Sequence, residues 1–236
     1  MRLSIPIYRL KRDAKHLARR TDLKLHQALD QVAADHGFRS WSHLSADSRK
    51  TNPTGAILGE VAQGDLVLLG ARPGHGKTML GLELAARSAQ IGRPSFFFTL
   101  EYHYCQVQEH VAEMGIKPVQ DDRGMVVDTS DNISADHIIS KTSRLQEPFT
   151  LVIDYLQLLD QRRSSQSLND QVQALRTHTK MHGGLCVMLS QIDRSFEGND
   201  KTMPDMSDVR RPNPLDLTAF DRAGFLHNGV FEMARL

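Results

Sequence analysis

From residue 59 onward, short apolar runs alternate with segments whose apolar residues recur at helical spacing. The apolar runs predict strands at residues 66–69, 95–100, 125–128, 151–154 and 185–190. The segments between them predict helices at residues 77–90, 104–114, 134–145 and 167–182. Because these strands are continuously apolar, we expect them to be buried on both faces, in a mostly parallel sheet flanked by helices. The sequence therefore predicts an α/β fold.

Two more apolar runs, residues 224–227 and 230–236, flank the dipeptide Asn228-Gly229. Asn-Gly between two apolar runs favours a tight β-hairpin, because both residues tolerate the backbone conformation that such a turn needs. We therefore expect a hairpin near the C-terminal end of the chain.

The first 45 residues follow a helical pattern instead. Apolar residues recur at helical spacing in residues 10–18 and 25–33, and Gly37 is a good stop for the second helix. Phe38, Trp41 and Leu44 form a third cluster, and we expect Trp41 to fill the core of three short helices. Residues 46–56 are polar and contain Pro53 and Gly55, which predicts a linker. The expected organisation is a helical head (1–45), a linker (46–56) and an α/β domain (57–236).

The two parts of the chain differ in net charge. The whole sequence of 236 residues has a net charge of +1. Residues 1–50 hold 11 Lys/Arg and 5 Asp/Glu, a balance of +6, whereas the other 186 hold 18 and 23, a balance of −5. A basic head suggests an anionic partner, as a DNA-binding or docking unit. A solvated helical surface, or a packing extension of the main domain, is equally compatible with this sequence.

Other bulk features favour a reduced, cytoplasmic protein. Only two cysteines occur, Cys105 and Cys186, far apart in the sequence. The basic N-terminal residues lack the apolar core of a secretory signal, and no apolar run is long enough to span a bilayer. We therefore expect no membrane partner.

A glycine-rich segment follows the first predicted strand and precedes the first predicted helix of the α/β domain. It consists of Ala71, Arg72, Pro73, Gly74, His75, Gly76, Lys77 and Thr78. A loop of this kind turns backbone N–H groups toward phosphate oxygens, and the helix that follows directs its positive end at the same anion. Lys77 can reach the β- and γ-phosphates of ATP, and the Thr78 hydroxyl can ligate Mg²⁺. Ala71 stands where the pattern has Gly, a mild departure that costs more only at positive φ.

Three further strands end in polar residues that suit the same chemistry. Ligands of parallel sheets bind beyond the carboxyl ends of the strands, where Glu101, Asp154 and Gln191 are expected. Asp154 suits a carboxylate that orients Mg²⁺, and Glu101 suits a base that activates water beside the γ-phosphate. Gln191 suits a neutral amide that senses whether the γ-phosphate is present.

These segments together resemble the successive motifs of the DnaB-type replicative helicases. The matching stretches are Ala-Arg-Pro-Gly-His-Gly-Lys-Thr (71–78), Thr-Leu-Glu (99–101), Ile-Asp-Tyr-Leu-Gln-Leu-Leu (153–159), Leu-Ser-Gln-Ile-Asp-Arg (189–194) and Ser-Asp-Val-Arg (207–210). The resemblance covers residues 57–236 and implies a RecA-like P-loop ATPase. It also implies a homo-oligomeric ring, such as a hexamer, with ATP between subunits and single-stranded DNA through its centre. By the same resemblance, loops carrying Arg162, Arg163, Arg194 and Arg210 would contact DNA phosphates.

Two departures from the family leave alternatives open. The head does not look like the collar that recruits primase, and only Arg235 is available as the family's arginine finger, without the Lys two residues earlier. The main hypothesis is an ATPase with Mg²⁺ that couples hydrolysis to translocation on DNA or its unwinding. One alternative is an ATP-binding switch without unwinding activity. Another is a regulator that docks on a larger helicase through its basic head.

Overall fold

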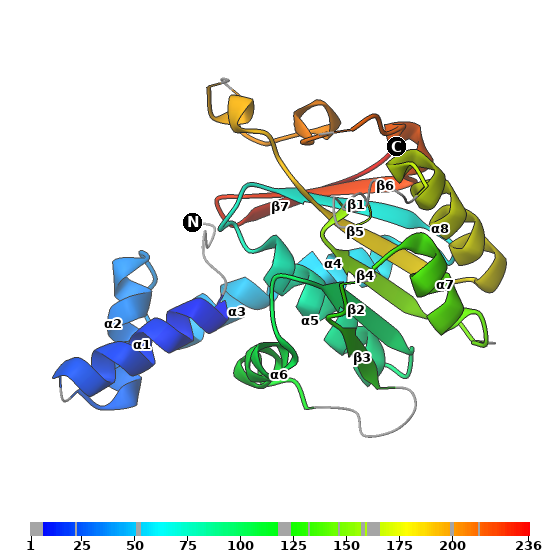
Figure 1. Cartoon of the computed structure of the whole chain (residues 1–236). Coiled ribbons are helices and arrows are strands. Elements are labelled where there is room, and N and C mark those ends of the chain that lie inside the picture. Colours follow the sequence, from blue (N-terminus) through cyan, green and yellow to red (C-terminus); the bar gives the residue numbers. More distant parts are fainter. Residues whose placement is uncertain are drawn as a thin grey trace.

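The computed structural model describes residues 7–21, 23–50, 53–117, 124–131, 133–145, 147–156, 159, 166–198, 201–211 and 213–236. Residues 53–236 form a sheet with helices on both faces, and three further helices stand beside it (Figure 1). We call residues 7–45 the head and residues 53–236 the body.

A seven-stranded sheet forms the centre of the body, in the order β3-β2-β4-β5-β1-β6-β7. Its strands are β1 (Leu66–Ala71), β2 (Ser95–Thr99), β3 (Met125–Asp128), β4 (Thr150–Asp154), β5 (Leu185–Gln191), β6 (Arg222–His227) and β7 (Val230–Arg235). All pairings are parallel except β6 with β7. The prediction of a mostly parallel sheet is confirmed, because β1, β2, β4 and β5 are buried over their full length apart from Gln191.

The predicted hairpin is also confirmed. Asn228 and Gly229 join β6 to β7 with φ angles of 46° and 73°. Both residues therefore have the positive φ that a two-residue hairpin turn requires. Among the described residues other than glycine, Asn228 is the one with positive φ.

Helices cover the sheet from both sides. One face packs on α7 (Ala135–Thr142) and α8 (Leu168–His182), and the other on α4 (Pro53–Glu60), α5 (Lys77–Gln90) and α6 (Tyr104–Glu113). Helix α5 lies very close to the sheet at Gly81, where an added Cβ would come within 2.8 Å of Leu189 and 3.0 Å of Val152. This approach fixes the N-terminus of α5 against β4 and β5, which positions the site described below.

The head has its own small core. Its helices are α1 (Ile7–Thr21), α2 (Leu25–Asp35) and α3 (Trp41–Lys50). The residues buried between them form a cluster separate from the two clusters of the body: Leu10, Ala14, Ala28, Val32, Ala33, Phe38 and Leu44. Gly37, with a φ of 80°, follows α2 as predicted. The expectation that Trp41 fills this core is wrong, because Leu44 is fully buried there whereas Trp41 is only partly buried.

The predicted linker is largely helical, which corrects the expectation for residues 46–56. Helix α3 continues to Lys50, and α4 begins at Pro53. Proline is favoured in the first turn of a helix, because its fixed φ suits the helix and its missing N–H has no partner there. Thr54 and Ile57 are buried, and Ile57 belongs to the core that α5 shares with the sheet. Tertiary packing therefore makes α4, which begins at Pro53, part of the body.

Two global features complete the description. Both cysteines are free, with Cys105 exposed and Cys186 buried in β5. Burial raises the pKa of the Cys186 thiol to about 12. Over the described ranges, no helix has the length and apolar character needed to cross a membrane.

The separate core of the head can be tested with Leu44→Ala. Removing this fully buried side chain should cost about 2–5 kcal/mol of the head's stability, because it leaves a cavity in a small core. Hydrogen exchange measured by mass spectrometry should then accelerate in α1–α3 and stay unchanged in β1–β5. Leu25→Ala, at a side chain that is 45% exposed, is the matched control and should have little effect. Equal acceleration across the body would show that head and body unfold together.

Candidate functional site

The loop between β1 and α5 has the backbone of an anion-binding loop. Gly74 and Gly76 have φ angles of 81° and 91°, a conformation that glycine adopts without strain. The N-terminal N–H groups of α5 have no partners within the helix and face the loop, where the helix dipole also favours negative charge. Ala71 is the last residue of β1 and does not have positive φ, so the expected backbone cost at this position does not arise.

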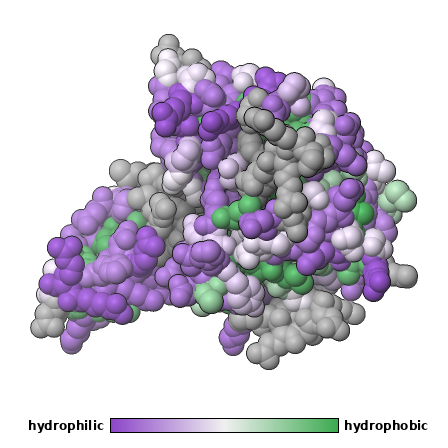
Figure 2. Space-filling model, in the orientation of Figure 1, coloured by the Kyte–Doolittle hydropathy of each residue, from purple (hydrophilic) through white to green (hydrophobic). Residues whose placement is uncertain are grey.

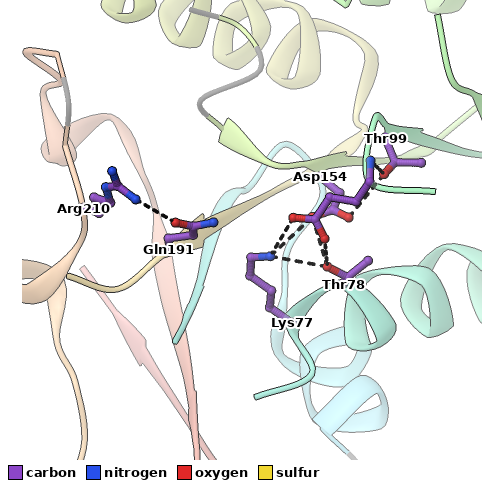
Figure 3. Close-up of polar contacts among 7 residues, drawn as sticks. Lys77, Thr78, Thr99, Asp154, Gln191 and Arg210 are labelled. Atoms are coloured by element: carbon purple, nitrogen blue, oxygen red, sulfur yellow. Dashed lines mark hydrogen bonds and ion pairs between the residues drawn. The ribbon is translucent and has the colours of Figure 1, made fainter. Parts of the chain in front are cut away.

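Four polar side chains converge where this loop meets α5 (Figure 3). Lys77 Nζ lies 3.4 Å from Glu101 Oε1 and 3.9 Å from Asp154 Oδ1. Thr78 Oγ1 lies 3.1 Å from Glu101 Oε2 and 3.3 Å from Asp154 Oδ1. The structure therefore brings together Lys77, Thr78, Glu101 and Asp154, which the sequence analysis assigned to one site from three separate segments.

The sheet register explains why Glu101 and Asp154 meet. Thr99, the last residue of β2, pairs with Asp154, the last residue of β4. The Thr99 hydroxyl donates to Asp154 Oδ2 at 3.4 Å and accepts from the backbone N–H of Glu101 at 3.0 Å. Sequence analysis missed Thr99 as a site residue, although a hydroxyl at the end of an apolar strand and two residues before Glu101 was visible. It also missed Tyr155, whose ring centroid lies 5.8 Å from Lys77 Nζ.

Burial dominates the electrostatics of this cluster. Asp154 is fully buried, which raises the pKa of its carboxyl group to about 7. The nearby Lys77 ammonium and the hydroxyls of Thr78 and Thr99 counteract this rise, and the Glu101 carboxylate adds to it. Glu101 differs, because about a third of its side chain (34%) remains exposed. One carboxyl group is thus held in the protein interior, while the other is accessible to water.

The donor set suits a hard divalent cation. The Thr78 hydroxyl has one proton, yet it lies within hydrogen-bond distance of two carboxylate oxygens. Three oxygens therefore face one another, and the carboxylates among them carry more negative charge than Lys77 can balance. Oxygen ligands of this kind are those that Mg²⁺ prefers. Thr78 and Asp154 are the residues positioned to hold such an ion directly or through water.

Gln191 lies at the same edge of the sheet but faces another partner. It ends β5 and pairs with Ala71 of the loop. Its side-chain oxygen accepts a hydrogen bond from the Arg210 guanidinium at 3.1 Å, and its backbone oxygen accepts from the Arg210 N–H at 2.8 Å. Figure 3 shows this pair apart from the Lys77 group. The amide is thus joined to the segment that carries Arg210 rather than to the cluster at Lys77.

Two side chains of the loop connect it to distant segments. The Arg72 guanidinium donates to the Ile192 carbonyl at 2.9 Å and pairs with Glu197 at 2.8 Å. The His75 ring stacks on His227 with centroids 5.0 Å apart, and its Nδ1 accepts from the Asn228 N–H at 3.1 Å. Burial, together with the charges of His227 and Arg72, lowers the pKa of His75. Sequence analysis missed Glu197 and His227, because nothing local in the sequence links them to the loop.

Of the remaining candidates, Arg194 and Arg235 lie outside the Lys77 cluster. Arg162 and Arg163 fall outside the described residues. Arg194 is exposed at the start of the 3₁₀ helix Arg194–Gly198, three residues after Gln191. Arg235 lies opposite Arg222 in the β6–β7 ladder, at the end of the sheet where β1 and β6 begin, and both residues line a cavity of about 530 Å³. The phosphate loop follows the other end of β1, so Arg235 cannot reach the phosphate site of the same chain.

The middle of the chain is similar in sequence to a known family. Residues 106–219 match the DnaB-like helicase C-terminal domain. Replicative DNA helicase DnaB from Synechocystis sp. is 27% identical over 186 residues, covering 66% of this chain and 21% of that protein. The corresponding protein from Leifsonia xyli subsp. xyli is 27% identical over 189 residues, covering 66% of this chain and 41% of that protein. The chain thus spans less than half the length of either relative.

Solved structures agree on the fold. A structure described as an ATPase domain matches with a TM-score of 0.57 and 19% identity, covering 79% of this chain and 80% of that chain. A DnaB-like replicative helicase, described with its interactions with primase, matches with a TM-score of 0.58 and 18% identity, covering 93% of this chain and 66% of that chain. The body therefore has the expected RecA-like fold. The loop at 71–78 precedes the matched range 106–219, so its assignment rests on its own sequence and geometry.

The raised pKa of Asp154 predicts a pH-dependent gain in stability for Asp154→Asn. Between about pH 4 and 7 the folded protein holds a proton on Asp154 that the unfolded chain releases, so wild-type stability falls as pH rises through this window. Asparagine does not titrate. In urea unfolding with EDTA and without nucleotide, the variant should match wild type near pH 4 and exceed it by a few kcal/mol at pH 8.

Glu109→Gln, at an exposed carboxylate on α6, is the control for this experiment. The difference in unfolding free energy between Glu109→Gln and wild type should change little with pH. The account of Asp154 would be wrong if wild type were the more stable protein at pH 8, or if its difference from Asp154→Asn were the same at both pH values.

Proposed function

We propose that this chain, whose body is related in sequence to the DnaB-type replicative helicases, is an ATPase that uses Mg²⁺ and couples hydrolysis to translocation on DNA or its unwinding. One observation carries the proposal: Lys77, Thr78, Glu101 and Asp154 come from three segments and converge beside the N-terminus of α5. Such a convergence provides binding for a triphosphate, ligands for a cation and a base for water in one place.

Each residue of the cluster has a distinct task in this proposal. Backbone N–H groups of residues 74–78 and the Lys77 ammonium bind the β- and γ-phosphates, as the loop geometry favours. Thr78 and Asp154 hold Mg²⁺, which when bound neutralises charge that develops on the phosphates. Glu101 accepts the proton of the attacking water, and its partial exposure gives water access to this carboxylate.

Gln191 and Arg210 connect the site to DNA in the same proposal. Gln191 ends the strand next to β1, and its amide is already bonded to Arg210. A change in the position of Gln191 on loss of the γ-phosphate would therefore shift Arg210. Arg210 and Arg194 contact the phosphates of single-stranded DNA, and we assign Arg162 and Arg163 to the same task by their resemblance to the family.

A ring-shaped homo-oligomer, such as a hexamer, completes the proposed enzyme. An arginine finger accelerates phosphoryl transfer by stabilising charge in the transition state. Arg235 lies at the end of the sheet where the parallel strands begin, remote from the phosphate loop of its own subunit. It could therefore serve only the site of a neighbouring subunit. We further propose that residues 1–45 and 57–236 are separate units, which the separate core of the head supports.

Substitutions at Lys77 and Glu101 should separate binding from hydrolysis. Lys77→Ala should lose ATP turnover by at least about 100-fold, because a buried cation that faces the phosphates is removed. Glu101→Gln should keep nucleotide binding and lose turnover by about 10²–10⁴-fold, because the amide cannot accept a proton. Fluorescent nucleotide titration and phosphate release measure the two properties.

Lys117→Ala and Glu109→Gln are the matched controls, since both side chains are exposed on the body away from the cluster. Both should bind and hydrolyse ATP like wild type. Normal turnover in Glu101→Gln would refute its assignment as the base that activates water.

Single-stranded DNA should stimulate ATP turnover, and Arg210→Ala should raise the DNA concentration needed for half-maximal stimulation by about tenfold. The reason is that the variant loses both a phosphate contact and the bond to Gln191. Arg144→Ala, at an exposed arginine that follows α7, is the control. Turnover that is indifferent to DNA would favour an ATP-binding switch over a translocase.

A further inference from the structure

One face of the head presents exposed cations that lack acidic partners. Lys11, Arg12, Lys15, Arg19 and Arg20 of α1 are all exposed. Within the described ranges, no carboxylate comes within ion-pair distance of any of the five. Asp13 is the one acidic residue in the sequence of α1, so the helix carries a large uncompensated positive charge. The view in Figure 2 shows a strongly hydrophilic surface over the head.

The packing of α1 determines where these cations point. Leu10 and Ala14 are buried in the head's core, and Leu17 and Ala18 pack against it. Lys11, Lys15 and Arg19 are spaced four residues apart, so they form a row with steps of about 6 Å along the helix. Arg12 and Arg20 flank this row on the exposed surface. The core therefore leaves these cations as a stripe on the exposed surface of α1.

The side chains in and around this stripe indicate which kind of anionic partner it can bind. A helix that binds a membrane surface needs a free apolar face, whereas the apolar face of α1 is already buried in the head. Single-stranded nucleic acid is bound on exposed aromatic rings, whereas Phe38 is buried and Trp41 packs against the core. A row of exposed cations on a helix whose described apolar residues pack into the head's core suits a stiff polyanion whose charges lie on its outside, which describes the backbone of duplex DNA.

The charge of the rest of the chain supports the same choice. Residues 51–236 carry a balance of −5, so the body repels a polyanion while residues 1–50 attract it with a balance of +6. Figure 1 shows the head projecting from the body on the side opposite to α7 and α8. A duplex can therefore approach α1 without lying along the acidic body.

We propose that the head binds duplex DNA through contacts of Lys11, Lys15 and Arg19 with backbone phosphates, without reading the base sequence. This surface is distinct from the loops that the proposed function assigns to single-stranded DNA. A duplex held on the head would keep the ATPase body close to the junction between double-stranded and single-stranded DNA.

The test uses the full chain and a fluorescent 20-base-pair duplex, without nucleotide or Mg²⁺, at 50–300 mM salt. The triple variant Lys11→Gln/Lys15→Gln/Arg19→Gln removes the row and keeps residues that favour helix formation. At 100 mM salt its affinity should fall at least about tenfold. Because each lost phosphate contact reduces the slope of log K against log salt by about 0.9, the slope should fall by about 2.7.

A body variant of equal charge, Arg93→Gln/Lys117→Gln/Arg144→Gln, is the matched control and should bind like wild type. The conservative variant Lys11→Arg/Lys15→Arg/Arg19→Lys should also bind like wild type, which shows that charge rather than residue identity matters. Circular dichroism and hydrogen exchange in α1–α3 verify that each variant folds. The binding reaction contains no nucleotide, so the measured affinity does not depend on whether the chain hydrolyses ATP.

Several results would overturn this proposal. An equal loss in the head and body variants would show that only net charge matters, and no loss in the head variant would show that the stripe is merely solvated. Tighter binding of a single strand of the same length through the same three residues would assign the stripe to single-stranded DNA. Binding to phosphatidylserine vesicles but not to the duplex would assign it to a membrane surface.

Discussion

The cost of burying Asp154 is the constraint on which the site depends. This carboxyl group ends a strand that is buried along its whole length, where an isolated negative charge is strongly unfavourable. The protein reduces that cost with Lys77 and with the hydroxyls of Thr78 and Thr99, but burial still exceeds their effect and the pKa stays near 7. A further cation beside Asp154 would therefore lower the cost of ionising this carboxyl group. Glu101 lies against the same lysine but keeps access to water, so the two carboxyl groups have different environments.

The phosphate loop is held by more of the protein than its own helix. Gly81 brings α5 against β4 and β5, which fixes the position of Lys77 and Thr78 over the strand ends. Arg72 and His75 then join the loop to the segment after Gln191 and to the hairpin turn at Asn228. Gln191 is in turn joined to Arg210. A displacement of the loop would therefore also move two segments that are distant from it in the sequence.

The head and the body differ in the size of their apolar cores and in the charge of their surfaces. The body buries two large clusters on the two faces of one sheet, and its midsection carries the match to the DnaB-like helicase domain. The head buries a small set of apolar side chains between three helices, and the exposed cations of α1 form no ion pair with any described carboxylate. A core of this size gives limited stability by itself, because little apolar surface is removed from water. A unit of this kind is well suited to present a charged helix.

The amino-acid sequence by itself determined the strands, the main helices, the Asn228-Gly229 hairpin and the four residues that meet at the phosphate loop. Each of these depends on local pattern: continuous apolar runs, turn residues with special φ, and polar residues at the ends of buried strands. The tertiary structure alone decided that Pro53 begins a helix, that Leu44 rather than Trp41 fills the head, and that Thr99, Glu197 and His227 adjoin the site. The tertiary structure also decided that Gln191 contacts Arg210, and that Arg235 lies at the end of the sheet where the parallel strands begin. These outcomes depend on strand register and on contacts between residues far apart in the sequence, where no local pattern specifies which side chains meet.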